Sequence, residues 1–304
     1  MTGLVRPPRL RPGDLVALVA PAGPVPPRLV DQALSTVDSW GLEKWVGPCV
    51  RGRHPGFGYL SGTDADRAAE FTEAWLRPEV SAVLAVRGGY GCLRMIDLID
   101  WDALAACPPK ILGGSSDITV LHEAVATRLG LTTVFAPMLS TDFFDDKAAE
   151  NLRATLFEPE STLVLATGEE LVPGTAKGPT VGGNLSLLAG TIGAPEHRPA
   201  EGGIAVLEDI TEEPYRLDRF LSQLLRSGWF DGVAGIALGA WTDCGPLDRV
   251  KALMADRLAP LGVPIGWDMG FGHLPGSPTI PLGVPATLAG GTLRLDVPAL
   301  AQVS

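Results

Sequence analysis

The sequence is poor in aromatic residues and in positive charge. Aromatic side chains make up 6% of the 304 residues, and 24 lysines and arginines stand against 35 aspartates and glutamates, which gives a net charge of −11. Proteins that track nucleic-acid phosphates normally carry a basic stripe, and those that bind single strands interleave it with aromatic rings. An anionic membrane surface would also repel this chain. The composition therefore argues against nucleic-acid and membrane partners.

Cysteine and histidine are equally scarce, with four residues of each. The cysteines are scattered, without a Cys-x-x-Cys pair and without clustering with histidine, so we expect no metal site, no redox pair and no cofactor. No stretch reaches about 18 uninterrupted apolar residues, and the first twelve residues lack the apolar segment of a signal peptide. We therefore expect a cytoplasmic protein with reduced thiols.

Apolar residues are plentiful, at 46% of the chain, and in the N-terminal half they form short runs that alternate with amphipathic segments. This alternation is typical of a mostly parallel sheet with helices on its faces. We expect an α/β domain over residues 1–165. Its predicted strands are 15–20, 82–86, 110–112 and 132–135, and its predicted helices are 27–40, 64–76 and 118–129.

The pattern loosens between residues 151 and 179, where glycine and proline break short β-like pieces. Such breaks are typical of a domain boundary, which we place in a linker over 166–178. Strand signals dominate the rest, so we expect a β-rich C-terminal α/β domain over 179–304. Its predicted strands are 204–207, 233–238, 279–282, 286–288 and 292–295, and its predicted helices are 214–226 and 247–258.

Ser116 is the candidate nucleophile. It follows the apolar stretch Lys110–Leu112 and two glycines, and a helical pattern begins at Ile118. A turn from strand to helix lifts a side chain out of a sheet and points backbone N–H groups at the same spot, which suits a serine nucleophile and its oxyanion. The sequence is not Gly-x-Ser-x-Gly, so an ordinary α/β-hydrolase is not indicated. The alternative is a serine that only caps the helix.

Two further segments look suited to a site. Arg87-Gly88-Gly89-Tyr90-Gly91 follows a predicted buried strand, and its glycines allow the backbone to approach a ligand, although a turn without function has the same pattern. Glu208 and Asp209 end another predicted strand, at the edge where open α/β sheets bind ligands. An acidic surface loop is the alternative for this pair, because Glu212 and Glu213 follow.

A serine nucleophile needs a base, and His273 is the histidine best placed by its context. It lies in the glycine-rich turn Gly270–Gly276 before a predicted strand, whereas His122 lies on the helix directly after Ser116. Spacing alone leaves His122 open as the base.

Taken together, these segments resemble the LD-carboxypeptidase family, serine peptidases that trim the terminal D-amino acid from cytoplasmic murein tetrapeptides and that have microcin-immunity peptidases as relatives. The resemblance extends over nearly the whole chain. It rests on Gly13-Asp14, Gly62-Thr63-Asp64 with Arg67, Arg87–Gly91, Gly114–Thr119, Gly182–Leu185, Leu207–Asp209 with Pro214–Arg219, and Gly270–His273.

The resemblance implies a Ser–Glu–His triad of Ser116, Glu208 and His273, with the serine on the first domain and its partners on the second. It also implies an active site between the domains, a homodimer, and a small muropeptide or peptidyl nucleotide as substrate. With these roles assigned, we expect the backbone N–H groups of Gly89 and Asp117 to form the oxyanion hole.

We further expect Arg87, Gly88 and Tyr90 to bind substrate, with Arg87 pairing with a terminal carboxylate; a structural ion pair is the alternative for Arg87. The sequence departs from the family at Ser115, where an aromatic residue is common, and at Phe135-Ala136, where relatives have His-Gly. These changes bear on substrate detail.

Two other functions compete with peptidoglycan recycling. A microcin-type peptidase would need an aromatic side chain to stack on a nucleobase, for which Trp241 and Trp267 are the candidates. A protein that only binds a small ligand would have no reason to combine Ser116, Glu208 and His273.

Overall fold

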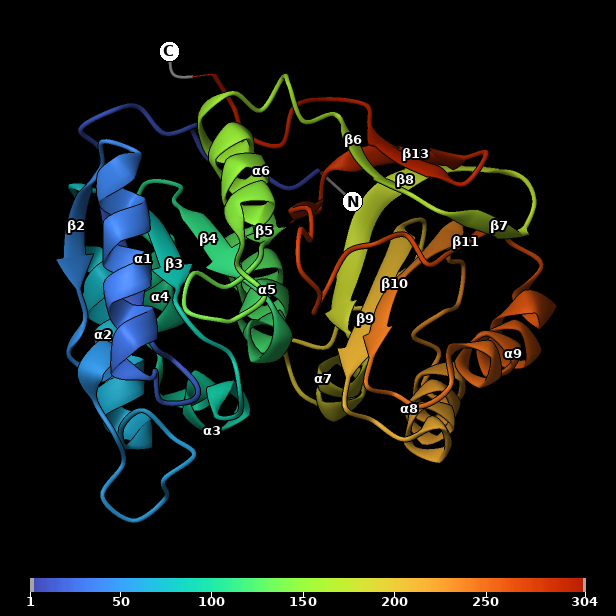
Figure 1. Ribbon diagram of the computed structural model, residues 1–304, viewed down its shortest axis with the longest axis horizontal. Coiled ribbons are helices and arrows are strands. Elements are labelled where there is room, and N and C mark those ends of the chain that lie inside the picture. Colours follow the sequence, from blue (N-terminus) through green and yellow to red (C-terminus); the bar gives the residue numbers. More distant parts are fainter. Residues whose placement is uncertain (1–2, 303–304) are drawn as a thin grey trace.

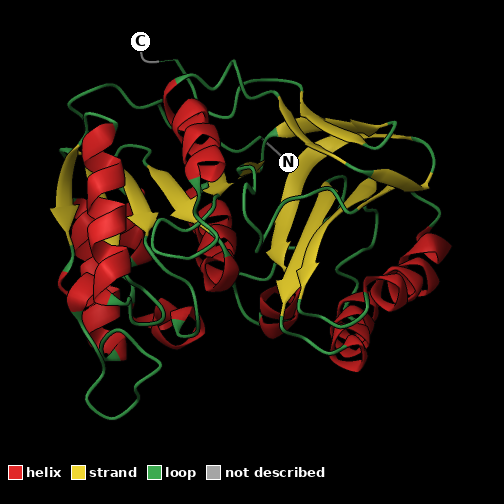
Figure 2. Ribbon diagram, viewed as in Figure 1, coloured by secondary structure: helices red, strands yellow, loops and turns green. Residues whose placement is uncertain are grey.

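The computed structural model describes residues 3–302 and contains two sheets that lie side by side, each flanked by helices (Figures 1 and 2). This confirms the predicted mixed α/β fold, with a mostly parallel N-terminal sheet. Within residues 3–302, no helix has the length and hydrophobicity needed to cross a bilayer.

The first sheet has six strands in the order β12-β5-β4-β3-β1-β2. Five are parallel, and β12 runs antiparallel at the edge beside β5. The strands are β1 (Leu15–Val19), β2 (Glu43–Val46), β3 (Val80–Ala85), β4 (Ile111–Gly114), β5 (Thr133–Phe135) and β12 (Ile280–Leu282). The helices of this half are α1 (Pro27–Ser39), α2 (Asp64–Leu76), α3 (Cys92–Met95), α4 (Trp101–Ala105), α5 (Thr119–Ala124) and α6 (Asp146–Phe157).

Helices cover both faces of this sheet. Consecutive residues of its strands are apolar and point to opposite faces, so both faces have apolar side chains to bury. Val16 and Leu18 pack into a core with α1 and α6, whereas Ala17 and Val19 pack into another with α2, α4 and α5. A continuous apolar run is the pattern expected of a parallel strand buried on both sides. The loops at the carboxyl ends of these strands are therefore held on a rigid support.

The second sheet has eight strands in the order β6-β14-β13-β8-β9-β10-β11-β7, of which β8 to β11 are parallel. The strands are β6 (Val164–Thr167), β7 (Glu169–Val172), β8 (Thr175–Asn184), β9 (Ile204–Ile210), β10 (Gly235–Thr242), β11 (Ile265–Trp267), β13 (Pro285–Ala289) and β14 (Thr292–Leu295). Helices α7 (Leu185–Gly190), α8 (Pro214–Arg226) and α9 (Leu247–Leu258) pack their apolar sides against one face. The other face joins the core that contains α1 and α6, so the two halves share buried contacts.

The residues predicted to be a linker, 166–178, are mostly strand and not loop. They contain the end of β6, all of β7 and the start of β8. Strand β7 lies at the sheet edge and pairs on one side only, with β11. Such a strand can carry polar residues, here Glu169 and Glu170, so its sequence does not look like a strand. The glycines and prolines between these short strands are turns within the sheet. The division into domains at this point remains a prediction.

Several elements were not predicted, and β2 and α6 illustrate why. Strand β2 is an edge strand that is only partly buried, so it lacks an apolar run. Helix α6 begins after Asp145, whose side chain accepts a hydrogen bond from the Ala148 N–H at 2.9 Å. This capping aspartate was a signal in the sequence that could have found the helix.

Candidate active site

Ser116 lies on a tight turn between β4 and α5. Gly114 has φ = +155° and Ser116 has φ = +59°, in the left-handed region that side chains other than glycine rarely adopt. Backbone strain of this kind is concentrated at functional sites, where neighbouring structure holds it in place. The Ser116 hydroxyl makes no hydrogen bond to another residue of the described range 3–302, and the helix-capping contacts do not use it. The turn therefore presents Ser116 without committing its side chain to a cap.

The loop Arg87–Gly91 lies directly against this turn. A β-carbon placed on Gly88 would lie 2.8 Å from Cβ and 3.1 Å from Oγ of Ser116, and 3.5 Å from the Asp117 nitrogen. The loop is fixed from the other side, because the Gly23 N–H donates to the Gly88 carbonyl at 2.9 Å. Only glycine fits at 88, and its backbone forms one wall of the space around the Ser116 hydroxyl.

His273 and Glu208 form a pair in the second half of the chain. Glu208 is fully buried at the carboxyl end of β9, and its Oε2 lies 2.6 Å from His273 Nδ1. Gly272 leaves room for this contact, since a β-carbon there would lie 2.6 Å from the same carboxylate oxygen. The backbone carbonyl of His273 accepts a hydrogen bond from the Thr242 hydroxyl at 2.5 Å. The ring is therefore oriented at Nδ1, and Nε2 is left for another partner.

The environment of His273 favours its charged form. Burial lowers the pKa of His273, but the negative charge of Glu208 and the hydrogen bond to it outweigh burial, so that the pKa lies above its usual value. Asp209 adds to this increase in pKa. The pair can thus stabilise an imidazolium ion, as a general base requires after it accepts a proton.

Asn184 and Asp209 complete the network behind Glu208. Asn184 lies opposite Glu208 in the pairing of β8 with β9, and its side-chain amide donates to Glu208 Oε1 at 3.2 Å and to Asp209 Oδ1 at 2.8 Å. The N–H of Ser186 donates to the other oxygen of Asp209. Burial, and then the neighbouring charge of Glu208, raise the pKa of Asp209 to about 7. Asp209 was expected near a ligand site from its place at the end of a strand, whereas this role of Asn184 was not predicted.

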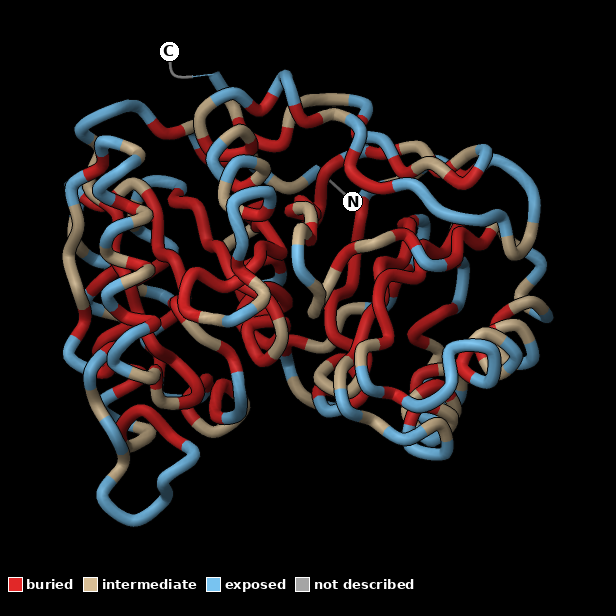
Figure 3. Tube along the Cα trace, in the orientation of Figure 1, coloured by how far each residue is buried: buried red, intermediate tan, exposed pale blue. Residues whose placement is uncertain are grey.

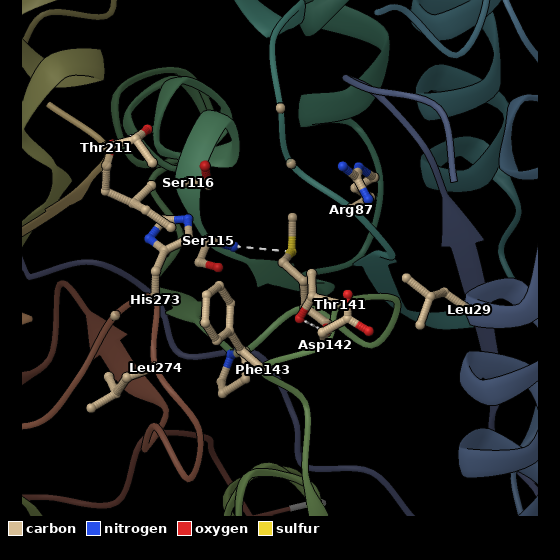
Figure 4. Close-up of a pocket in the computed structure, with 16 residues that line it drawn as sticks. Leu29, Arg87, Ser115, Ser116, Thr141, Asp142, Phe143, Thr211, His273 and Leu274 are labelled. Atoms are coloured by element: carbon tan, nitrogen blue, oxygen red, sulfur yellow. Dashed lines mark hydrogen bonds between the residues drawn. The ribbon is translucent and has the colours of Figure 1, made fainter. Parts of the chain in front are cut away.

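The two halves meet at a cavity of about 440 Å³. Figure 4 shows Ser116, His273 and Arg87 among its lining side chains. Other lining residues were not predicted, including Thr211 with φ = +60°, and Phe143, whose ring lies edge-on to His273 at 6.3 Å. One space is therefore lined by a nucleophile, by an imidazole that a carboxylate supports, and by a guanidinium. Within residues 3–302, this guanidinium has no ion-pair partner.

Comparison with known proteins identifies the family of the chain. Models of the N-terminal and C-terminal domains of LD-carboxypeptidases match residues 16–136 and 177–288. The chain belongs to the LD-carboxypeptidase family. It is accordingly a hydrolase of the serine peptidase type.

Three relatives illustrate the similarity. The chain is 55% identical to a putative carboxypeptidase of Streptomyces coelicolor, over 99% of both chains. It is 39% identical to a probable murein peptide carboxypeptidase of Bacillus subtilis, over 93% of this chain and 91% of that one. The crystal structure of muramoyltetrapeptide carboxypeptidase from Oxalobacter formigenes has a TM-score of 0.80 and 28% identity, and the match covers 92% of this chain and 97% of that one.

Some residues predicted for the site of this LD-carboxypeptidase family member do not line the cavity. Tyr90 lies outside it and is 47% exposed. The Asp117 side chain is buried and accepts a hydrogen bond from the Cys92 N–H at 2.7 Å, and its backbone nitrogen lies near Gly88. Gly88 and Gly89 do line the cavity.

His122, the other candidate base, is fully buried below the turn. Its Nε2–H donates to the Gly114 carbonyl at 2.8 Å, and burial lowers its pKa to about 4. It therefore supports the backbone of the turn as a neutral ring. Trp241 and Trp267, the candidate nucleobase stackers, are buried in the core beneath α7, α8 and α9 and do not line the cavity. Nothing in their position favours nucleotide binding.

Proposed function

We propose that this protein is a cytoplasmic LD-carboxypeptidase that removes the terminal D-alanine of murein tetrapeptides during peptidoglycan recycling. The observation that carries the proposal is that Ser116 faces the same cavity as His273, which is itself paired with buried Glu208. The names of the Bacillus and Oxalobacter relatives support the choice of substrate. We further propose a homodimer, as expected from the family resemblance.

In the first half of the reaction, His273 Nε2 accepts the Ser116 proton as Oγ attacks the carbonyl carbon of the penultimate residue. The His273 Nδ1–H donates to Glu208, which stabilises the imidazolium that forms. The tetrahedral intermediate then collapses: the carbon–nitrogen bond breaks, and the imidazolium gives its proton to the amine of D-alanine. The tripeptide remains as an ester on Ser116.

In the second half, His273 accepts a proton from water, whose oxygen attacks the ester carbonyl, and Ser116 leaves as the alcohol. The oxyanion in both halves accepts hydrogen bonds from the backbone N–H groups of Gly89 and Asp117. The contact between Gly88 and the Ser116 turn supports this assignment. One such donor is typically worth about 3 kcal/mol of barrier.

Arg87 binds the carboxylate of the terminal D-alanine. This role is supported by its place in the cavity wall and by the absence, within residues 3–302, of an acidic side chain that pairs with it. A charge-assisted hydrogen bond here selects peptides that end at the residue to be removed.

Mass spectrometry of a muropeptide mixture incubated with the protein tests the proposal. We expect tetrapeptides alone to lose one alanine, and Ser116→Ala to retain less than about 0.1% of the rate, as for other serine peptidases that lose the nucleophile. Ser39→Ala, on the exposed side of α1, serves as the control. Cleavage that survives Ser116→Ala would overturn the nucleophile, and loss of cleavage in a chelator would overturn a reaction that needs no metal. Binding without cleavage by the unaltered protein would favour a ligand-binding role.

A further inference from the structure

Four ring side chains form a continuous row on the surface beside the active-site loop. Along this row, which we call the aromatic ridge, the centroids of His54 and Phe57 are 4.9 Å apart, those of Phe57 and Tyr59 5.8 Å, and those of Tyr59 and Tyr90 6.0 Å. Phe57, Tyr59 and Tyr90 are 45%, 53% and 47% exposed. Single exposed apolar side chains are ordinary, but a contiguous exposed group marks a binding surface.

The aromatic ridge is continuous with the active site. Tyr90 directly follows Gly89, which lines the catalytic cavity. Gly23 gives a second connection, at Tyr59, because a β-carbon there would lie 2.9 Å from the Gly88 carbonyl oxygen and 3.6 Å from that of Tyr59. Gly88 in turn lies against Ser116. Figure 3 shows the segment that carries His54, Phe57 and Tyr59 as a mostly exposed loop at the end of the molecule near α3.

We propose that the aromatic ridge is a saccharide subsite that binds the muramoyl sugar attached to the peptide substrate. This inference rests on the proposed function and specifies the substrate class of the same site. Three peptide residues separate the sugar from the bond that is cleaved in a muramoyl tetrapeptide, and three extended residues span about 10 Å. A sugar at that distance from Ser116 reaches Tyr90, which follows the glycines of the Gly88 loop, and the Tyr59 segment that packs on Gly23. The apolar C–H face of a pyranose stacks on exposed rings, while tyrosine hydroxyls bond its polar rim.

Charge on the ridge also fits this ligand. The Arg94 guanidinium lies 5.4 Å from the centroid of the Phe57 ring, and exposed Arg53 donates to the Gly58 carbonyl at 3.4 Å. Arg53 forms no ion pair with another residue of the range 3–302. Arg94 is already paired with Asp64, at 2.9 Å, so Arg53 is the cation on the ridge that is left to attract an anionic muropeptide to a protein whose overall charge is −11.

The test compares two substrates, the free tetrapeptide and the same peptide carrying N-acetylmuramic acid. For the unaltered protein, we expect a KM for the muramoyl peptide at least about fivefold lower, the order that stacking on two rings gives. The double variant Phe57→Ala/Tyr59→Ala should remove this difference and leave kcat and the free-peptide constants within about twofold. Leu76→Ala is the matched control, because Leu76 is 44% exposed on α2. It should leave the KM of both substrates unchanged.

Equal KM values for the two substrates in the unaltered protein, or an equal loss with both in the double variant, would overturn the subsite. A double variant that changes the oligomeric state in sedimentation and keeps the KM ratio would make the ridge an interface between copies and overturn it too. If the protein cleaves neither substrate, the proposed function fails. Calorimetry then tests the subsite separately, by measuring the binding of N-acetylmuramoyl dipeptide. Binding that the double variant abolishes supports the subsite, and absence of binding overturns it.

Discussion

Gly88 packs so closely on Ser116 that a β-carbon at 88 would lie 2.8 Å from Ser116 Cβ. Real β-carbons do not approach this closely, so either the turn or the loop would have to move. Gly88→Ala should therefore displace the nucleophile relative to the oxyanion hole and lower kcat by about 100-fold, as misplacement by about 1 Å can do. Steady-state kinetics on a tetrapeptide measures this loss.

Gly190→Ala is the matched control for Gly88→Ala. Its β-carbon would meet only the end of the Leu93 side chain, at 3.3 Å, and it lies on the exposed side of α7. We expect kcat within about twofold of the unaltered protein, because surface substitutions away from such close contacts have small effects. A Gly88→Ala variant that is as active as this control would show that the Ser116 turn tolerates the extra carbon.

The pairing of His273 with Glu208 predicts the pH dependence of the reaction. The base must be neutral, and the pKa of His273 is raised, so kcat/KM should increase with pH through a midpoint above about 6.5. Glu208→Gln removes the negative charge that raises the pKa of His273 and leaves only a neutral amide oxygen as acceptor, so the midpoint should fall. The maximal rate should fall by about 10²- to 10⁴-fold, because the ring loses its orientation and its stabilised cation.

The control for Glu208→Gln is Glu213→Gln, which removes an exposed carboxylate five residues further along the chain. It should leave the midpoint of the pH profile unchanged. An unaltered midpoint in Glu208→Gln would mean that a group other than His273 controls the profile.

The local chemistry of Ser116 could be predicted from the sequence because it depends on neighbours in the chain. Glycines before a serine at the start of a helix predict a turn, and the turn was found. The choice between His122 and His273 could not be made this way, since it depends on which ring is buried under the turn and which one enters the cavity. The triad roles came from family resemblance and not from spacing.

The hydrogen-bond network behind Glu208 could not be predicted from the sequence for a related reason. Asn184 meets Glu208 and Asp209 because β8 and β9 pair in one particular register, and a shift by one residue would turn these side chains to the opposite face. Register is set by packing across the whole sheet. Strands β6 and β7 were missed for a different reason, since they lie at the two edges of the sheet, pair on one side only and carry no long apolar run.

Asp209 predicts a component of the stability that depends on pH. Its pKa is raised from 3.8 to about 7, so the folded protein holds a proton that the unfolded chain has released. The contribution of Asp209 to the free energy of unfolding is therefore complete below about pH 4 and is lost as the pH rises through about 7.

Asp209→Asn is uncharged at every pH and lacks this component. Between about pH 4.5 and 7.5, the free energy of unfolding of the unaltered protein should therefore fall relative to that of Asp209→Asn. The fall should be at most about 1.4 kcal/mol per pH unit. Urea denaturation measures it, with exposed Asp256→Asn on α9 as the control. A difference that is independent of pH would show that Asp209 is charged throughout.

Arg87 predicts selectivity for a free carboxylate. If its guanidinium binds the terminal carboxylate, Arg87→Gln should raise KM and lower kcat/KM for the tetrapeptide by about 10- to 100-fold, the range for a hydrogen bond between charged groups. The same variant should change kcat/KM for the C-terminal amide by less than about threefold, because that substrate has no charge to lose. Arg226→Gln, at the end of α8, removes one positive charge far from the cavity lining and controls for net charge. An equal loss of kcat/KM with the acid and the amide would mean that Arg87 only supports the structure of the loop, since direct binding of the carboxylate would affect the acid alone.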